Sequence, residues 1–297
     1  MSTYLITGAT GNTGKPVALG LLAAGHTVRI LSRNAAKAKE LTDKGAILFQ
    51  GAPTDIALLT DALAGVNAAY FLVAVEWSAP DFTAAQREQV EAFASAAKAA
   101  SLKKLVTLSS LGANLPEGNG VVNGLYHMEQ AMNAIEGLDV LHLRASYFME
   151  NTLGQVGIVK HMGIMGTPVK ADLKIPMVAT CDIGAKALQH LLALDFHGKS
   201  VESVLGPRDL TYTEASAILG AAIGKPEINY VEFPYDQAAQ GMMQAGAGAS
   251  LTERMMEFVK CMNEGHVLAG VQRNGHNTTP TDMKDFAATF KAVYEMN

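Results

Sequence analysis

The sequence has few cysteines, few charges and no long hydrophobic run. Only two cysteines occur among its 297 residues, Cys181 and Cys261, which excludes a disulfide framework and favours a reducing compartment. Charged residues make up 17% of the chain and hydrophobic residues 49%, which argues against disorder along most of its length. The net charge is −5, so the chain lacks the basic balance of proteins that bind nucleic acid directly.

The sequence also shows no pattern typical of a targeting segment or a membrane span. The opening residues, MSTYLITGATGNTG, have neither the basic region nor the long apolar stretch of a signal peptide. Elsewhere, glycine, polar or charged residues interrupt each apolar run well short of a membrane span. We therefore expect a cytoplasmic protein without a membrane partner, with enough apolar content for one large domain or one domain and a small appendage.

Short apolar runs alternate regularly with helical patterns in the first half of the chain. Strands are predicted at residues 4–6, 27–31, 46–49, 69–73, 104–108 and 140–143. Helices are predicted between them, at residues 16–24, 35–44, 55–63, 82–100 and 122–135, with Asp55 as an N-cap. Strands separated by helices of this length indicate right-handed crossovers. The predicted fold class is α/β, with a Rossmann-like, doubly wound parallel sheet.

The pattern changes after about Asn151, where helices dominate and strands become sparse. We predict one doubly wound α/β domain at residues 1–151 and a smaller, mainly helical lobe at residues 152–297. Some segments of the lobe are expected to return to the first domain, but the lobe is predicted to be too helical to extend the sheet. Its helix starts are indicated by Thr211 with Glu214, by Ser250 with Glu253, and by Thr279 before Pro280.

The strongest motif is a glycine-rich turn that follows the first predicted strand and opens the first helix. Its spacing is G-x-x-G-x-x-G, and the residues expected to bind a cofactor are Gly8, Thr10, Gly11, Asn12, Thr13 and Gly14. Glycine permits a tight turn and lets backbone N–H groups approach a pyrophosphate, and the helix N-terminus adds partial positive charge. At this place in an alternating chain, the motif predicts a dinucleotide site.

The end of the second predicted strand distinguishes the two nicotinamide cofactors. An NAD site usually has an acidic residue there, which accepts a hydrogen bond from the ribose 2′-hydroxyl. Here Arg33 follows the strand and Lys37 lies one turn later. A guanidinium binds a 2′-phosphate through two charge-assisted hydrogen bonds, so NADP is the predicted cofactor, with NADPH preferred over NADH. The alternative is that Arg33 is a solvated loop charge.

With these residues in place, the chain resembles the NmrA-like branch of the atypical short-chain dehydrogenases/reductases. The matching stretches span nearly the whole chain and include ITGATGNTGKPV, LSRNAAKA, LKKLVTLSSLGA, GLDVLHLRASYFMEN, CDIGAKAL and TPTDMKDFAATF. The run from Leu143 to Asn151 is the part most specific to this branch. The resemblance implies an NADP-binding, Rossmann-like domain, here residues 1–151, a smaller C-terminal substrate domain, here mainly residues 152–297, and NADP(H) between them. Such proteins include reductases of quinones and other small molecules, and also NADP(H) sensors without turnover.

A Tyr-x-x-x-Lys pair, which serves proton transfer in related dehydrogenases, is incomplete here. Tyr126 is present on the predicted helix after the fifth strand, but Gln130 stands where lysine belongs. In an alternative alignment, Tyr126 itself stands where many NmrA-like relatives have a lysine. Tyr126 and His127 are the candidate proton donors, although a helix-surface role is the simpler interpretation of His127.

Other candidates lie at the carboxyl ends of the predicted strands, where Rossmann-like sheets bind their ligands. Val73 and Ala74 are expected to pass the ribose and pyrophosphate of the cofactor, and Tyr147 is expected to approach the nicotinamide. Ser109 is a candidate cofactor contact, with capping of nearby backbone as its alternative. Weaker candidates are Val75, Trp77, Ser110, Ser146, Phe148 and Asn151.

Methionines cluster in the C-terminal part, where they could line an adaptable apolar pocket or simply pack between helices. The cluster consists of Met242, Met243, Met255, Met256 and Met262. No metal site is predicted, because Cys261, His266 and His276 lack the close pairing of zinc ligands.

These patterns lead to the hypothesis of a cytoplasmic NADPH-binding oxidoreductase that transfers a hydride to a quinone or similar electron-poor small molecule. A quinone can accept hydride directly and take its protons from water, so the incomplete Tyr–Lys pair does not exclude it. The alternative is a non-catalytic NADP(H) sensor that binds a partner protein, which Gln130 favours. Sugar-nucleotide epimerisation is disfavoured because it requires the intact pair. A homo-oligomer is compatible with the sequence, which contains no specific sign of one.

Overall fold

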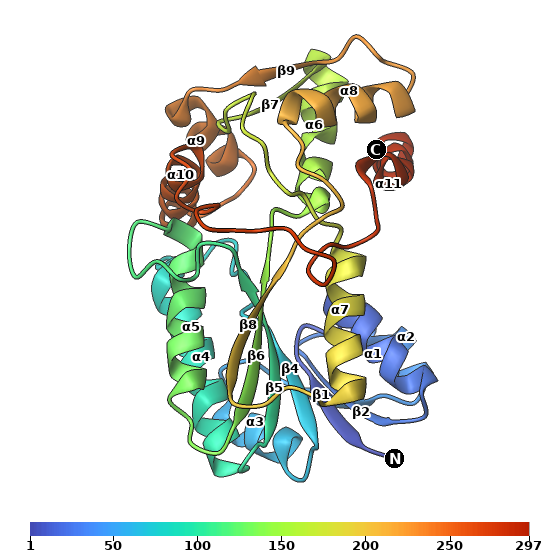
Figure 1. The fold of residues 1–297 in the computed structure, drawn as a ribbon, viewed down its shortest axis with the longest axis vertical. Helices are drawn as coiled ribbons and strands as arrows, with labels where there is room; N and C mark the ends of the chain where they lie inside the picture. The colour runs from blue at the N-terminus through green and yellow to red at the C-terminus, as the bar shows by residue number, and fades with distance from the viewer. Residues whose placement is uncertain (297) are drawn as a thin grey trace.

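A seven-stranded parallel sheet forms the centre of the protein in the computed structural model, which describes residues 1–296 (Figure 1). Its strand order is β3-β2-β1-β4-β5-β6-β8, and every neighbouring pair is parallel. The strands are β1 (Thr3–Ile6), β2 (Thr27–Ser32), β3 (Ile47–Gln50), β4 (Ala68–Phe71), β5 (Lys104–Ser110), β6 (Asp139–Ala145) and β8 (Lys199–Val204). The order reverses between β1 and β4, which is where doubly wound sheets bind ligands.

Helices cover both faces of this sheet. Side chains of α1 (Gly14–Ala23), α2 (Ala35–Asp43) and α7 (Thr180–Ala193) pack into the core on one face. Those of α3 (Ile56–Leu63), α4 (Phe82–Ala99) and α5 (Asn123–Asn133) form the core on the other. Because both faces are covered, the central strands are continuously apolar, as in the four buried residues of β4. The α/β fold class and the doubly wound parallel sheet are therefore confirmed.

Three of these helices begin at a side-chain cap. Asn34, Asp55 and Asp81 each accept a hydrogen bond from the backbone N–H three residues later, so each satisfies one of the donors that a helix start leaves unpaired. The predicted cap at Asp55 is confirmed. All six predicted strands and the five helices between them occur, with ends that differ by a few residues.

The seventh strand, β8, contradicts the expectation that the second half could not extend the sheet. Residues Lys199–Val204 pair in parallel with β6, and α7 packs against α1, so both elements join the first half of the chain. The strand was missed because its sequence, KSVESV, is short and half polar. It lies at the edge of the sheet and is only partly buried, so it needs no continuous apolar run.

A second group of elements lies beyond the carboxyl ends of the sheet (Figure 1). It contains the two-stranded parallel sheet of β7 (Ile164–Thr167) and β9 (Asn229–Glu232), and the helices η2 (Met149–Gln155), α6 (Val156–Met162), α8 (Tyr212–Ala222), α9 (Tyr235–Gln244), α10 (Ala249–Asn263) and α11 (Met283–Met296). Its core includes buried side chains of α8, α10 and α11. A short helix, η1 (Gly120–Val122), lies against α10.

Of the three helix starts predicted in the second half of the chain, one is correct. Thr211 caps α8 and forms the predicted capping box with Glu214. The prediction at Ser250 is wrong, because α10 begins at Ala249 with Gly248 as its N-cap, two residues earlier than a cap at Ser250 would place it. The Ser250 hydroxyl instead accepts a hydrogen bond from the backbone N–H of Phe82 (3.0 Å).

The predicted start at Pro280 is also wrong, since α11 begins at Met283. Asp182 of α7 accepts hydrogen bonds from both the backbone N–H (2.9 Å) and the hydroxyl (2.8 Å) of Thr281. These bonds hold the segment before α11 against α7, and the helix begins three residues later than predicted.

Within residues 1–296, no helix is both long and apolar enough to cross a membrane. The same residues contain no group of three or more His, Cys, Asp or Glu side chains placed to hold a metal ion.

Candidate functional site

The glycine-rich turn between β1 and α1 is held in shape by backbone contacts. Gly8 has a φ of +59°, a conformation that L side chains rarely adopt, and its carbonyl accepts a hydrogen bond from the Gly11 N–H (2.9 Å). A Cβ atom at Gly14 would lie 2.4 Å from the Gly8 oxygen, so no side chain fits there. Thr13 and Gly14 are buried under the turn, whereas Thr10, Gly11 and Asn12 are exposed. The turn therefore offers an open backbone cradle at a helix N-terminus, which suits a pyrophosphate.

The turn is also supported from its neighbours on both sides. The Thr7 hydroxyl bonds the Tyr70 carbonyl (3.3 Å) and accepts from the Leu72 N–H (3.1 Å), so it ties the ends of β1 and β4 together. On the other side, a Cβ atom at Gly184 of α7 would lie 2.8 Å from the Thr13 carbonyl oxygen. Sequence reasoning missed both residues, because their importance depends on elements that are distant along the chain.

Arg33 lies directly after β2, as predicted, and its side chain is 60% exposed. One guanidinium nitrogen, Nη1, lies 2.9 Å from Oε1 of Glu76, which belongs to the loop after β4. Lys37 lies exposed in the first turn of α2. The structure thus brings Arg33 and Lys37 to the same end of β2, together with an acid that sequence reasoning did not connect to them.

The loop after β4 begins earlier than predicted, because the strand ends at Phe71 and leaves Val73 and Ala74 outside it. The buried side chain of Gln89, on α4, accepts a hydrogen bond from the Ala74 N–H (2.9 Å) and donates one to its carbonyl (3.0 Å). This amide fixes the path of the loop beside the glycine-rich turn. A glutamine on the mainly apolar, buried face of α4 was the only sequence signal for it.

A buried polar network joins β5, β6 and α5. The Ser109 hydroxyl donates to Glu129 (2.5 Å), and Arg144 donates to both oxygens of the same carboxylate (2.9 and 2.5 Å). Glu129 is 2% exposed and Arg144 is 20% exposed, so the charges compensate each other in a site with little water. Ser109 is therefore directed at α5, and its contact with a cofactor stays a prediction.

His142 is the centre of a second buried polar group between the same three elements, β5, β6 and α5. Its Nδ1 lies 2.7 Å from the Thr107 hydroxyl, and its Nε2 lies 3.0 Å from the Asn133 side-chain oxygen. Burial lowers the pKa of His142 from 6.5 to about 4, because the charged ring would lose its hydration. The imidazole is consequently neutral at pH 7.

This lowered pKa predicts a loss of stability in acid. Because the unfolded chain binds the proton first, the free energy of unfolding falls between about pH 6.5 and pH 4, by up to about 3 kcal/mol. Urea unfolding of the wild type and of His142→Gln at pH 7, 5 and 4 measures this contribution. We expect the variant to lose less stability than the wild type over this interval. Parallel losses in the two proteins would contradict the assignment.

Tyr126 and His127 lie half-buried on α5, with their rings edge to face and their centroids 5.4 Å apart. Gln130 is exposed on the same helix, so it does not take the place of the missing lysine in a buried pair. The role of Tyr126 or His127 as a proton donor stays a prediction.

At the end of β6, Tyr147 accepts a hydrogen bond from the buried Tyr212 hydroxyl (2.7 Å). Burial raises the pKa of both hydroxyls, so both stay protonated at neutral pH. The neighbouring Ser146 has a buried hydroxyl without a hydrogen-bond partner among the described residues. A bound molecule that reached this strand end could satisfy it.

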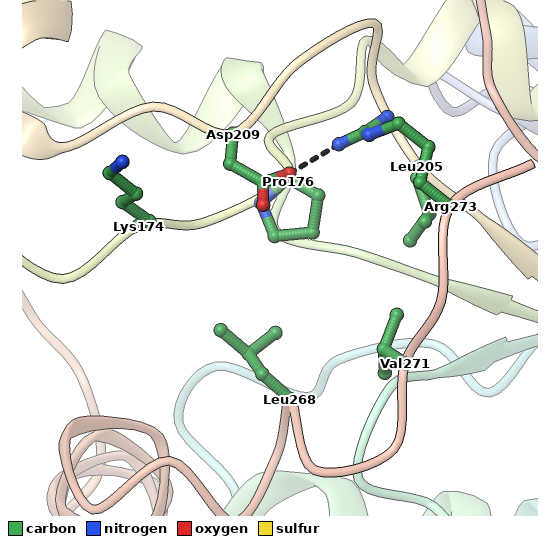
Figure 2. Close-up of a pocket in the computed structure, with 7 residues that line it drawn as sticks. All are labelled: Lys174, Pro176, Leu205, Asp209, Leu268, Val271 and Arg273. Atoms are coloured by element: carbon green, nitrogen blue, oxygen red, sulfur yellow. Dashed lines mark hydrogen bonds and ion pairs between the residues drawn. The ribbon is translucent and has the colours of Figure 1, made fainter.

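A cavity of about 200 Å³ lies beside the carboxyl end of β8 (Figure 2). It is lined by Pro176, Leu205, Leu268 and Val271, and by three charged residues, Lys174, Asp209 and Arg273. Arg273 donates to the Asp209 carboxylate and to the Gly206 carbonyl. Figure 2 shows the three charged residues on one side of the space and Leu268 and Val271 on the other, so the cavity has a charged side and an apolar side.

The methionine cluster does not line this cavity. Met256 and Met262 are buried in the helix core, which supports packing as their role, and Met243 is 47% exposed. The sole tryptophan, Trp77, is 48% exposed in the loop after β4, and its carbonyl accepts a hydrogen bond from the Gly248 N–H (2.9 Å).

Comparisons with known proteins identify the family and agree with the fold. The family model described as "NmrA-like family" matches residues 1–287. Over 288 residues the chain is 29% identical to the NAD(P)H azoreductase of Xenophilus azovorans, covering 97% of this chain and 96% of the relative. In fold it is similar to the NADPH-dependent quinone oxidoreductase of Escherichia coli in complex with NADPH, with a TM-score of 0.80, 23% identity and coverage of 96% and 99%. The triphenylmethane reductase of Citrobacter sp. in complex with NADP(H) gives a TM-score of 0.78, 19% identity and coverage of 97% and 99%.

Proposed function

The chain belongs to the NmrA-like family, and on that premise we propose that it transfers a hydride from NADPH to a quinone or similar electron-poor small molecule. It is an NAD(P)H-dependent oxidoreductase, the class of its curated relatives. Membership of that class leaves the acceptor and the preference for NADPH open, and both are part of the proposal. The observation that carries the proposal is the backbone cradle at the start of α1, beside Arg33 at the end of β2.

The residues around this cradle fit a dinucleotide. The absence of a Cβ atom at Gly14 keeps the turn closed, and the exposed Thr10 and Asn12 supply backbone N–H groups for phosphate oxygens, whereas the Gly11 N–H bonds the Gly8 carbonyl. Arg33 and Lys37 supply positive charge for a 2′-phosphate, and Ser146 has a free hydroxyl at the end of β6. Val73, Ala74, Ser109 and Tyr147 are proposed as further contacts at the strand ends. NADPH bound there supplies the hydride from C4 of its nicotinamide.

The acceptor must react without a Tyr–Lys pair. A quinone meets this condition because its ring accepts hydride readily and water protonates its oxygens, so the chain mainly holds two flat rings together. We propose Tyr126 or His127 as an assisting donor, and the side of the cavity formed by Leu268 and Val271 in Figure 2 as a place for part of the acceptor. The elements beyond the strand ends would then form the substrate lobe.

Replacement of Arg33 by aspartate should lower the affinity for NADPH about 10- to 100-fold and leave the affinity for NADH nearly unchanged. The reason is the loss of charge-assisted hydrogen bonds to the 2′-phosphate, each worth about 1.5–3 kcal/mol. Dissociation constants of both cofactors, measured for the wild type and Arg33→Asp, test this. Equal affinities of the wild type for NADPH and NADH would refute the 2′-phosphate assignment.

Turnover is tested by following NADPH absorbance with a panel of quinones and aldehydes. The proposal expects oxidation of NADPH with quinones and little or none with aldehydes, which need a protein acid. Tight NADPH binding without turnover of any acceptor would favour the alternative, an NADP(H) sensor that acts on a partner protein, for which the exposed Gln130 is the supporting observation. We place either activity in the cytoplasm, in keeping with two free cysteines.

A further inference from the structure

The ion pair between Arg33 and Glu76 crosses the site where the proposed cofactor lies. Arg33 follows β2 and Glu76 belongs to the loop after β4. In the sheet these two strands lie on either side of β1, whose carboxyl end leads into the glycine-rich turn. The pair therefore joins the two loops that flank this turn.

The guanidinium of Arg33 is the group assigned to the cofactor 2′-phosphate, and Glu76 already occupies it. The Nη1–Oε1 distance is 2.9 Å, with side-chain exposures of 60% for Arg33 and 32% for Glu76. A pair this exposed is weak and screened by salt. A phosphate dianion binds a guanidinium more strongly, through two charge-assisted hydrogen bonds. Phosphate can thus displace the carboxylate, but the carboxylate lowers the affinity that results.

We propose that Glu76 is a specificity-determining residue that competes with the 2′-phosphate for Arg33 and so limits the preference for NADPH over NADH. This inference rests on the proposed function, because it assumes that a dinucleotide binds at the glycine-rich turn. NADH lacks the 2′-phosphate, so it binds without breaking the pair. The acid that an NAD site has at the end of the second strand is missing here, and the only acid that contacts Arg33 among residues 1–296 comes from the loop after β4.

The loop after β4 also contains an intrinsic fluorophore. Trp77 directly follows Glu76 and is the only tryptophan in the chain. It is 48% exposed, so its emission is sensitive to a change of its surroundings. Release of Glu76 from Arg33 should alter that emission, whereas a ligand that leaves the pair intact should not.

The first experiment is calorimetric titration of NADP⁺ and NAD⁺ into the wild type, Glu76→Gln and Asp43→Asn. Asp43, the last residue of α2, is a matched control. Asp43→Asn removes the same charge and also breaks an exposed ion pair, the 2.7 Å pair with Lys39. We expect Glu76→Gln to bind NADP⁺ about two- to fivefold more tightly, with NAD⁺ changed less than twofold. The gain should shrink in 0.5 M NaCl. Asp43→Asn should leave the ratio of the two affinities unchanged.

The second experiment records Trp77 emission with adenosine 2′,5′-bisphosphate and with AMP, which lacks the 2′-phosphate. The wild type should respond to the bisphosphate and much less to AMP, and Glu76→Gln should show a reduced response to the bisphosphate. Equal responses to both nucleotides, or an unchanged NADP⁺/NAD⁺ affinity ratio in Glu76→Gln, would overturn only the role of Glu76 and would leave the proposed function standing. A wild type that binds neither dinucleotide would overturn the proposed function and this inference together.

Discussion

Gly14→Ala is expected to lower the affinity for NADPH about 100-fold or more. The new Cβ atom would lie 2.4 Å from the Gly8 carbonyl oxygen, 2.7 Å from its carbon and 3.0 Å from the Ala9 nitrogen. All three are backbone atoms, so the turn must open to make room. Two or more hydrogen bonds to the pyrophosphate would then be lost, each worth about 1.5–3 kcal/mol when one partner is charged. Calorimetric titration with NADPH measures the loss.

Gly154→Ala is the matched control, because a Cβ atom there meets nothing within 4 Å. It should bind NADPH as the wild type does. Thermal unfolding of both variants separates a local defect of the turn from general unfolding. An affinity of folded Gly14→Ala within about threefold of the wild type would show that the turn does not hold the cofactor.

Arg144→Met is expected to reduce the free energy of unfolding by about 3–5 kcal/mol. The substitution leaves the Glu129 carboxylate, which is 2% exposed, without the guanidinium that donates to both of its oxygens. Ser109 alone cannot compensate a buried charge. Urea unfolding at pH 7 measures the difference, and the effect is among the largest expected from a single substitution.

Two further variants test the cause. In Arg144→Met with Glu129→Gln the buried charge is gone, so most of the lost stability should return. Lys39→Met removes an exposed ion pair with Asp43 and should cost less than about 1 kcal/mol. If the double variant is no more stable than Arg144→Met, the loss comes from packing and not from an uncompensated carboxylate.

The predictable parts of the fold were those with a local signal. Each of the first six strands is an apolar run bounded by a helix, and the glycine-rich turn lies directly between the first strand and its helix. β8 had no such signal, because an edge strand tolerates the polar residues of KSVESV. The start of α11 was misplaced because Asp182, about a hundred residues away, holds Thr281 by two hydrogen bonds.

In the candidate site, too, only the residues with a local sequence signal were predictable. The glycines and Arg33 could be recognised from spacing and position. Partners such as Glu76 for Arg33, Gln89 for Ala74 and Glu129 for Ser109 could not, since each pairing depends on how two distant elements pack. For Gln89 and Glu129, a polar residue on a mainly buried helix face is the only trace of the pairing in the sequence.

Transfer of hydride from bound NADPH is tested most directly by single turnover with a quinone, using NADPH that carries deuterium on one or the other side of nicotinamide C4. Our account predicts that cofactor oxidation is slowed by deuterium on one side only, because the bound ring presents a single face to the acceptor. It also predicts that Gly14→Ala loses the reaction at cofactor concentrations that saturate the wild type. Bound NADPH that no quinone oxidises, or oxidation that neither label slows, would contradict it.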